Sequence, residues 1–249
     1  MPFSLRALRD LATCLALALL VPACGGDDTA ATTGTPGPEG PDDGLPASCN
    51  PLRAKDACLL PYPSAVFTRD DASSPTGLRL DLTSELFPRN SLSVAFDPVR
   101  LNRLDGFSPA TQIIAFFPDR LDGASLPPLT DPEASLAKDS ATALVDMDTG
   151  ERVAHFAEVD AQSTREDDRQ TLILRPMKRL ENGHRYAVAI TSRVKTLAGN
   201  PPDPPAGWDA ILDGTATTAR GMRQAARMPA IFEALAKVEV ARDDVVLAW

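Results

Sequence analysis

The clearest alternation of apolar and polar positions in the chain lies between Thr171 and Pro201. Apolar residues recur at every second position in 172–174 and again in 186–190, which is the period of a β-strand. Pro176 ends the first strand because it has no N–H to donate to a neighbouring strand. Asn182-Gly183 is a strong turn signal, since both residues tolerate positive φ. The pattern predicts a hairpin of two strands.

Further strands are expected before this hairpin, at the spacing of a β-sandwich. Leu92, Val94 and Phe96 alternate with polar or small residues, whereas 113–117 is a continuous apolar run that is expected to be buried on both faces. Residues 143–147 precede a turn at Asp148-Thr149-Gly150, and 151–159 is expected to return as the second strand of a hairpin.

The period changes after the hairpin. In 217–237 apolar residues recur near helical spacing, and Pro229 is expected to kink this helix or divide it into two. Residues 243–249 have the pattern of a final strand. With 23 prolines and only 5% aromatic residues, the composition favours a loop-rich, mainly β fold over a helical one.

Several residues of the predicted hairpin resemble the C-terminal half of the bacterial Ig-like domain of S-layer-type proteins. They share its order and spacing, and they are Leu174, Pro176, Leu180, Gly183, Tyr186, Val188, Ile190, Val194, Lys195, Gly199, Asn200 and Pro201. Leu180, Gly183 and Tyr186 have a spacing similar to that of a tyrosine corner, in which the Tyr hydroxyl bonds back to the backbone at a sheet corner. The resemblance implies an Ig-like β-sandwich over 91–205 and says little about chemistry.

A second resemblance covers the region before this sandwich. The string Cys-Leu-Leu-Pro-Tyr-Pro-Ser at 58–64 is followed by Asp97-Pro98, Asn102-Arg103 and 105–109. These segments are similar to the N-terminal regions of large exported bacterial proteins related to lipases, whose later domain is an α/β-hydrolase. The resemblance implies that 206–249 leads into such a domain beyond Trp249.

The start of the chain has the pattern of an export signal. Arg6 and Arg9 precede a short apolar run at 11–21, which is shorter than the roughly 20 residues of a membrane-spanning helix. Residues 21–24, Val-Pro-Ala-Cys, resemble a bacterial lipobox, although Pro is uncommon at its position. We therefore expect a signal peptide over 1–23 and lipidation of Cys24; the alternative is an ordinary signal peptide with a chance cysteine.

The stretch that follows Cys24 predicts a tether. Residues 25–48 contain no aromatic residue and only one large aliphatic residue, Leu45, so they cannot bury enough apolar surface to offset the entropy of ordering. We expect 24–48 to be a disordered linker that holds the later domains off a membrane. The predicted location is outside the cytoplasm, on the outer-membrane, periplasmic or cell-surface side.

Two cysteines remain for the folded part of the chain. Cys49 and Cys58 form an even pair in a chain expected to be exported, which favours a disulfide at the start of an extended entry segment over 49–90. The alternative, a metal-binding pair, lacks further Cys or His ligands at finger spacing.

The residues that a hydrolase needs are not apparent in the pattern. The string nearest to a Gly-x-Ser-x-Gly nucleophile elbow surrounds Ser108, but it lacks the second Gly, and Pro109 removes a backbone donor that an oxyanion hole requires. Of the two histidines, His155 is expected to be a half-buried strand residue and His184 to face solvent after the turn glycine. We therefore predict no catalytic residue.

Charge and carboxylates exclude further classes of function. The net charge of −9 and the lack of a basic stripe argue against nucleic acid and against attraction to anionic lipid. Carboxylates gather at Asp70-Asp71, at Asp146 with Asp148, and at 166–168, but none has EF-hand spacing. We interpret them as solvated charge, and predict no metal and no cofactor.

Two functions remain open at this point. One is a lipid-anchored, non-catalytic spacer or binding module that contacts the membrane through Cys24. The other is the N-terminal accessory part of an exported esterase or lipase whose catalytic triad lies beyond Trp249. The sequence identifies no ligand, substrate or protein partner for either.

Overall fold

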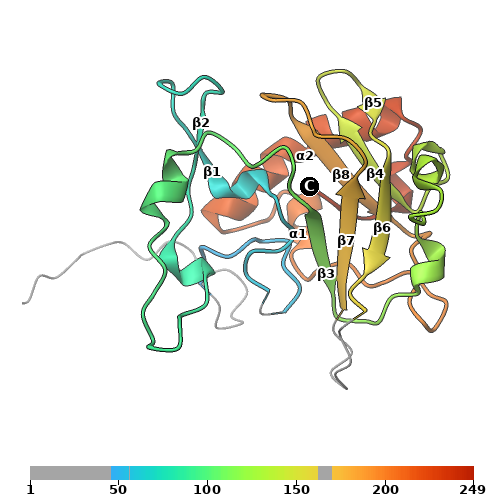
Figure 1. Ribbon diagram of the computed structural model, residues 1–249, viewed down its shortest axis with the longest axis horizontal. Coiled ribbons are helices and arrows are strands. Elements are labelled where there is room, and N and C mark those ends of the chain that lie inside the picture. Colours follow the sequence, from blue (N-terminus) through green and yellow to red (C-terminus); the bar gives the residue numbers. More distant parts are fainter. Residues whose placement is uncertain (1–45, 56, 162–169) are drawn as a thin grey trace, which may run out of the picture. The chain divides into compact units, whose positions relative to one another are not determined.

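Antiparallel strands form three sheets in the part of the chain that the computed structural model describes, residues 46–55, 57–161 and 170–249 (Figure 1). The three-stranded sheet has the order β3–β7–β6, with β3 at Ile113–Phe117, β7 at Gln170–Pro176 and β6 at His155–Val159. The four-stranded sheet has the order β5–β4–β8–β9, with bounds Glu151–Arg152, Thr142–Asp146, Tyr186–Thr191 and Val245–Ala248. A ribbon of β1 (Thr68–Asp70) and β2 (Leu78–Leu80) completes the set. The prediction of a mainly β chain is confirmed.

Side chains of the two larger sheets share one hydrophobic core, an arrangement consistent with a β-sandwich. Buried positions alternate with half-buried ones along β3, so the expected burial of both faces is only partly present there. In β4 every residue is buried, because helix α2 (Ala219–Lys237) packs on the four-stranded sheet. The short helix α1 (Trp208–Leu212) packs against α2.

The predicted hairpin between β7 and β8 is wrong, although both strands exist. β7 pairs with β3 and β6, whereas β8 pairs with β4 and β9, so the connection at 177–185 crosses from one sheet to the other. The turn at Asn182-Gly183 is present, with Gly183 at φ 77°. Nine residues between the strands give the chain enough length to change sheets, which the periodicity alone does not reveal.

The hairpin expected for 151–159 forms only at its beginning. Asp146 and Val145 of β4 pair with Glu151 and Arg152 of β5, around a turn in which Gly150 has φ 77°. After Arg152 the chain leaves this sheet, and β6 pairs with β7 in the other one. Between β3 and β9 the chain therefore changes sheet three times, from β3 to β4, from β5 to β6 and from β7 to β8.

The strand expected at 92–96 is wrong. This segment is a loop with Leu92 81% exposed, and no neighbouring strand of the described residues pairs with it. Its backbone bonds locally instead: Leu92 and Val94 donate N–H groups to Oδ1 of Asn90 at 2.9 Å. A side-chain acceptor has replaced the ladder that the alternating pattern predicts.

One of the two alternatives expected at Pro229, a division into two helices, is wrong, because α2 runs as one helix from Ala219 to Lys237. Pro229 is exposed, and Met228 and Ile231 on either side of it are buried in the core. This packing holds the helix together despite the hydrogen bond that a proline removes. The final strand after the helix is confirmed as β9.

A second, smaller core lies under the entry region. It is formed by Val66, Phe67, Leu80, Leu82 and Leu86, and Phe107 packs against it. The remaining short helical turns are 3-10 helices at Ala65–Phe67, Ser84–Leu86, Pro98–Arg103, Gly123–Ser125, Pro132–Leu136 and Arg242–Asp244.

The expected signal peptide, Cys24 and all but the last residues of the linker lie outside the described residues, as do the carboxylates at 166–168. Among the helices that the structure describes, none combines the length and the apolar character required to cross a bilayer.

Candidate functional site

The candidate site forms where β4 ends and β8 begins. Asp146 is the last residue of β4, and the register places it opposite Tyr186, the first residue of β8. Oδ1 of Asp146 accepts hydrogen bonds from the N–H groups of Asp148 at 3.0 Å and Thr149 at 3.2 Å. The carboxylate thereby fixes the turn that follows its own strand. Asp146 is buried, with 6% of the residue exposed, so the interpretation of this residue as solvated charge is wrong.

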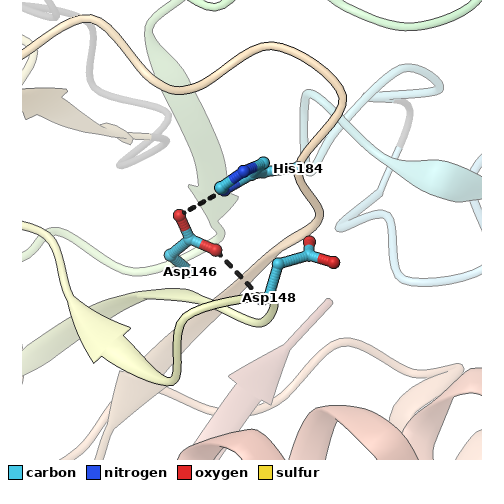
Figure 2. A group of neighbouring side chains, drawn as sticks. All are labelled: Asp146, Asp148 and His184. Carbon is cyan, nitrogen blue, oxygen red and sulfur yellow. Dashed lines mark hydrogen bonds and ion pairs between the residues drawn. The ribbon is translucent and has the colours of Figure 1, made fainter.

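His184 meets this carboxylate from the segment that precedes β8. Nδ1 of His184 donates a hydrogen bond to Oδ2 of Asp146 at 2.8 Å (Figure 2). The imidazole also stacks on the ring of Tyr186, with centroids 6.5 Å apart. About a third of the His184 side chain is exposed, so the expected solvent-facing position is only partly correct. The side chain is otherwise covered because it pairs with Asp146, an acidic residue distant in sequence.

Asp148 completes the group on the solvent side. Its Oδ2 accepts the backbone N–H of Arg185 at 2.7 Å, and its Oδ1 lies 3.5 Å from Nη2 of the same residue. Met147 in turn donates its N–H to the carbonyl of Arg185 at 2.8 Å. Two carboxylates of one turn therefore hold the segment that leads into β8.

The hydrogen bond between Asp146 and His184 shifts the pKa of each residue in the direction expected for an ion pair. Burial raises the pKa of Asp146, but the hydrogen bonds from His184 and from the N–H groups of Asp148 and Thr149 outweigh it, so the pKa lies below the ordinary value. The hydrogen bond to Asp146 raises the pKa of His184, against a smaller opposing effect of burial. The charged forms of both residues are therefore stabilised together.

The same three side chains offer donors that a divalent ion accepts. One ligand atom from each of Asp146, Asp148 and His184 can be chosen so that all lie within 4.8 Å of one another. Carboxylate oxygens and an imidazole nitrogen suit several divalent ions. However, Nδ1 of His184 already donates to Asp146, whose other oxygen accepts backbone N–H groups, so a metal bound through Nδ1 would have to displace the bond between the two side chains. The geometry is that of a structural ion pair.

The tyrosine of the predicted corner lies beside this group. The Tyr186 hydroxyl accepts the backbone N–H of Glu181 at 2.8 Å, five residues upstream. Leu180 is buried and donates its own N–H to the carbonyl of Pro109 at 2.9 Å. Gly183 supplies the positive φ between them. The hydrogen bonds of Leu180 and Tyr186, together with the turn at Gly183, therefore fix the connection that crosses between the sheets.

His155 is fully buried, and the expectation of a half-buried residue is wrong. Its Nδ1 lies 2.9 Å from the carbonyl of Val153 and its Nε2 lies 2.8 Å from Oγ1 of Thr142, so Nδ1 donates and Nε2 accepts. Burial lowers the pKa of His155 to about 4. The imidazole is a neutral cross-link between β4 and β6, the two strands that face each other across the core.

The serine of the rejected elbow has a local role. Oγ of Ser108 accepts the N–H of Ala110 at 3.3 Å, and neither histidine is among its hydrogen-bond partners in the described residues. The structure therefore does not bring Ser108 to the candidate site.

The predicted disulfide is confirmed. A disulfide joins Cys49 to Cys58, nine positions later in the chain, and their Cα atoms are 4.5 Å apart. The N–H of Asn50 donates to the carbonyl of Cys58 at 2.8 Å, and its side chain donates to the carbonyl of Pro61 at 2.9 Å. The entry segment is therefore closed into a small loop against the start of the folded part.

Sequence reasoning missed the Asp146–His184 pair, although both residues were considered singly. The available signal was the pairing of β4 with β8: continuing the register by two residues past Tyr186 brings His184 beside the turn at Asp148. That pairing could not be recognised while β8 was expected to pair with β7.

Comparison with known proteins gives no relative. No family model matches the chain, and neither a curated protein nor a solved structure matches it.

Proposed function

We propose that the chain is a lipid-anchored module outside the cytoplasm whose Ig-like β-sandwich has a structural or binding role rather than a catalytic one. The observation that carries this proposal is the use made of the two histidines. Each is held by hydrogen bonds that join strands or turns, and in the described residues neither is bonded to a hydroxyl or thiol that a substrate could reach.

His155 comes nearest to a nucleophile–base pair, because Nε2 lies 2.8 Å from the Thr142 hydroxyl. Both residues are fully buried, so a substrate has no access to them. The lowered pKa, about 4, makes the imidazole a poor base at neutral pH, and the atom that orients it is a backbone carbonyl and not a carboxylate. This pair is suited to linking strands in the core.

His184 has the carboxylate partner that His155 lacks. In the described residues, however, the hydrogen bond recorded for its ring is the one to Asp146, and no serine, threonine or cysteine is bonded to it. An Asp–His pair without a bonded hydroxyl or thiol lacks the nucleophile that a serine-type or cysteine-type hydrolase uses.

Two features support the Ig-like assignment: the arrangement of the strands in two sheets and the tyrosine corner at Tyr186. Two antiparallel sheets share a core, and the connection between β7 and β8 crosses from one to the other. At this crossing the Tyr186 hydroxyl accepts a backbone N–H, as in the corner of Ig-like sandwiches. The resemblance of 174–201 to a bacterial Ig-like domain supports the same assignment.

The anchor rests on the sequence around Cys24. Cys24→Ser is expected to move the protein from the membrane fraction to the soluble fraction and to abolish labelling by a radioactive fatty acid. The matched control is Cys14→Ser, which changes a cysteine of the expected signal peptide and should leave both readouts unchanged. Labelling that persists in Cys24→Ser would contradict the anchor.

The second candidate, an accessory region of an exported esterase or lipase, rests on the second sequence resemblance. Asn102, part of the second resemblance, donates to the carbonyl of Leu82 at 2.8 Å and accepts its N–H at 2.9 Å, so this motif residue holds the smaller core. The gene sequence beyond the codon for Trp249 decides between the candidates. An in-frame hydrolase with a Gly-x-Ser-x-Gly elbow supports the second, and a stop codon supports the first.

A further inference from the structure

The loop at 88–97 exposes apolar side chains, of which Leu92 is the least covered by the described part of the chain. Leu92 is 81% exposed, Val94 58% and Phe96 44%, and the adjacent 3-10 helix adds Val99 at 57%. In Figure 1 the loop, in green tones, projects on the side of the described part opposite β5 and β6. Single exposed apolar residues are ordinary on protein surfaces, but four within eight positions form a patch that needs an explanation.

The loop is ordered by its own hydrogen bonds. The N–H groups of Leu92 and Val94 both donate to Oδ1 of Asn90, and that of Ser93 donates to the Asn90 carbonyl at 2.9 Å. Asn90 donates its own N–H to the carbonyl of Val94 at 3.1 Å. Four backbone N–H groups are thus satisfied within the loop, while the side chains of Leu92 and Val94 remain exposed. Satisfied donors lower the cost of moving the loop from water into a less polar medium.

The aromatic ring of Phe96 packs the loop against the segment that precedes it. It packs against the ring of Phe87 with centroids 4.7 Å apart, and Oδ1 of Asp97 accepts the N–H of Val99 at 3.0 Å. These contacts fix the C-terminal end of the exposed segment, and the bonds to Asn90 fix its beginning. Its exposure is therefore a property of a defined conformation.

The charged residues in the same segment indicate what this apolar patch binds. Arg89, Arg100 and Arg103 are all exposed, and Asp97 is the acid that lies within 88–104. The segment therefore carries a net charge of +2 in a chain whose total is −9. Arginines interspersed with Leu, Val and Phe are typical of segments that lie in the interface of an anionic bilayer. The charge of the whole chain, which argues against lipid, does not describe this patch.

We propose that residues 88–104 form a membrane-docking patch that inserts Leu92 and Val94 into the interface of an anionic lipid bilayer. This inference extends the proposed attachment through Cys24, because an anchor would keep the patch near the membrane. The side chain of Ser48, near the end of the expected linker, donates to Oε2 of Glu85 at 2.9 Å, so the linker enters the folded part close to the loop. The lipid anchor on Cys24 would hold the protein near the membrane, and the patch would determine which surface of the folded part faces the lipid.

A tryptophan placed at the tip of the loop tests the proposal. Leu92→Trp is introduced into the full chain, and its fluorescence is measured with vesicles of phosphatidylglycerol and brominated phosphatidylcholine. The native Trp208 and Trp249 are buried, with 4% and 6% exposed, and serve as a constant background. The matched control is Leu197→Trp, which replaces an exposed leucine in the turn after β8, 63% exposed.

The expected result is a blue shift and quenching of the tryptophan at 92, with neither change at 197. Each of Arg89→Gln, Arg100→Gln and Arg103→Gln should weaken partition onto the anionic vesicles about fivefold, from the roughly 1 kcal/mol that a basic residue contributes at such a surface. Leu92→Ser should weaken partition without lowering the thermal unfolding midpoint, because this side chain is outside the core.

Equal emission at 92 with and without vesicles would overturn the proposal. A blue shift that grows with protein concentration in the absence of lipid would also overturn it, by showing that a second copy covers the patch. Repeating the measurement in Cys24→Ser separates the two proposals. Quenching at 92 that persists in this variant supports the patch whatever the fate of the anchor, and its loss at every lipid concentration would contradict the patch.

Discussion

Oδ2 of Asp146 accepts a hydrogen bond from Nδ1 of His184 at 2.8 Å, although the two residues are 38 positions apart in the chain. The bond joins the turn after β4 to the segment before β8, and Asp148 reinforces it through the N–H of Arg185. An ion pair of this kind between two turns fixes the ends of neighbouring strands. Its contribution to stability depends on the charge of both partners.

We predict a stability window for this pair. The pKa of Asp146 is lowered, so its contribution is present above its ordinary pKa and is lost as the pH falls through the folded value. The pKa of His184 is raised, so its contribution is complete below its ordinary pKa and is lost as the pH rises through the folded value. The pair should stabilise the fold most between pH about 4 and about 6.5.

Urea unfolding of the protein and of His184→Gln over this pH range measures the effect. The difference in the free energy of unfolding should be largest inside the window and should shrink above it. In an Asp146→Asn background the same substitution should give a difference that does not depend on pH, because the charged partner is absent. A wild-type difference that is independent of pH would contradict the ion pair.

The two histidines should titrate far apart. Burial lowers the pKa of His155 to about 4, whereas the pKa of His184 is above its ordinary value. Since the chain has two histidines, a pH titration of their ring signals by NMR can follow each one, with His184→Gln providing the assignment. Two signals that titrate together near pH 6.5 would show that the described environments are wrong.

The buried position of His155 has a consequence for acid stability. Its folded pKa is lower than the unfolded one, so the unfolded state binds the proton first and stability falls as the pH drops from about 6.5 to about 4. The whole shift is equivalent to about 3 kcal/mol at most. Calorimetric midpoints of His184→Gln at pH 7 and pH 4.5 test the sign, because this variant lacks the opposing effect of the ion pair, and a midpoint of the variant that rises on acidification would contradict it.

Tyr186→Phe should lower the free energy of unfolding by about 1 kcal/mol, because it removes the acceptor of the Glu181 N–H and keeps the ring. The urea m-value should stay constant, since the same surface is exposed on unfolding. An unchanged urea midpoint would mean that the hydroxyl does not hold the connection between the sheets.

The local sequence patterns predicted the strands better than their partners. The alternation at 172–174 and 186–190 located β7 and β8, but it carries no information on which sheet each strand joins, and the short turn at Asn182-Gly183 suggested the wrong pairing. Residues 92–96 have strand alternation without any strand to pair with, and Asn90 satisfies their backbone instead.

Burial was the other quantity that the patterns left open. Asp146 and His155 occupy strand positions whose second face is covered by parts of the chain far away in sequence, so their burial follows from the tertiary fold alone. The disulfide was predictable because Cys49 and Cys58 are close in sequence and no further metal ligands accompany them. The Asp146–His184 pair depends on the β4–β8 register and could not be found before that register was known.

The central claim is that the histidines hold the fold and do not catalyse, and ester hydrolysis tests it most directly. The purified protein is assayed with p-nitrophenyl butyrate beside His184→Ala, His155→Ala and Ser108→Ala, with circular dichroism to confirm that each variant is folded. Loss of a true nucleophile–base set typically lowers the rate by several orders of magnitude. We predict that all four proteins hydrolyse the ester at the background rate. Turnover by the wild-type protein that disappears in folded His184→Ala would contradict the claim and identify the Asp146–His184 pair as part of an active site.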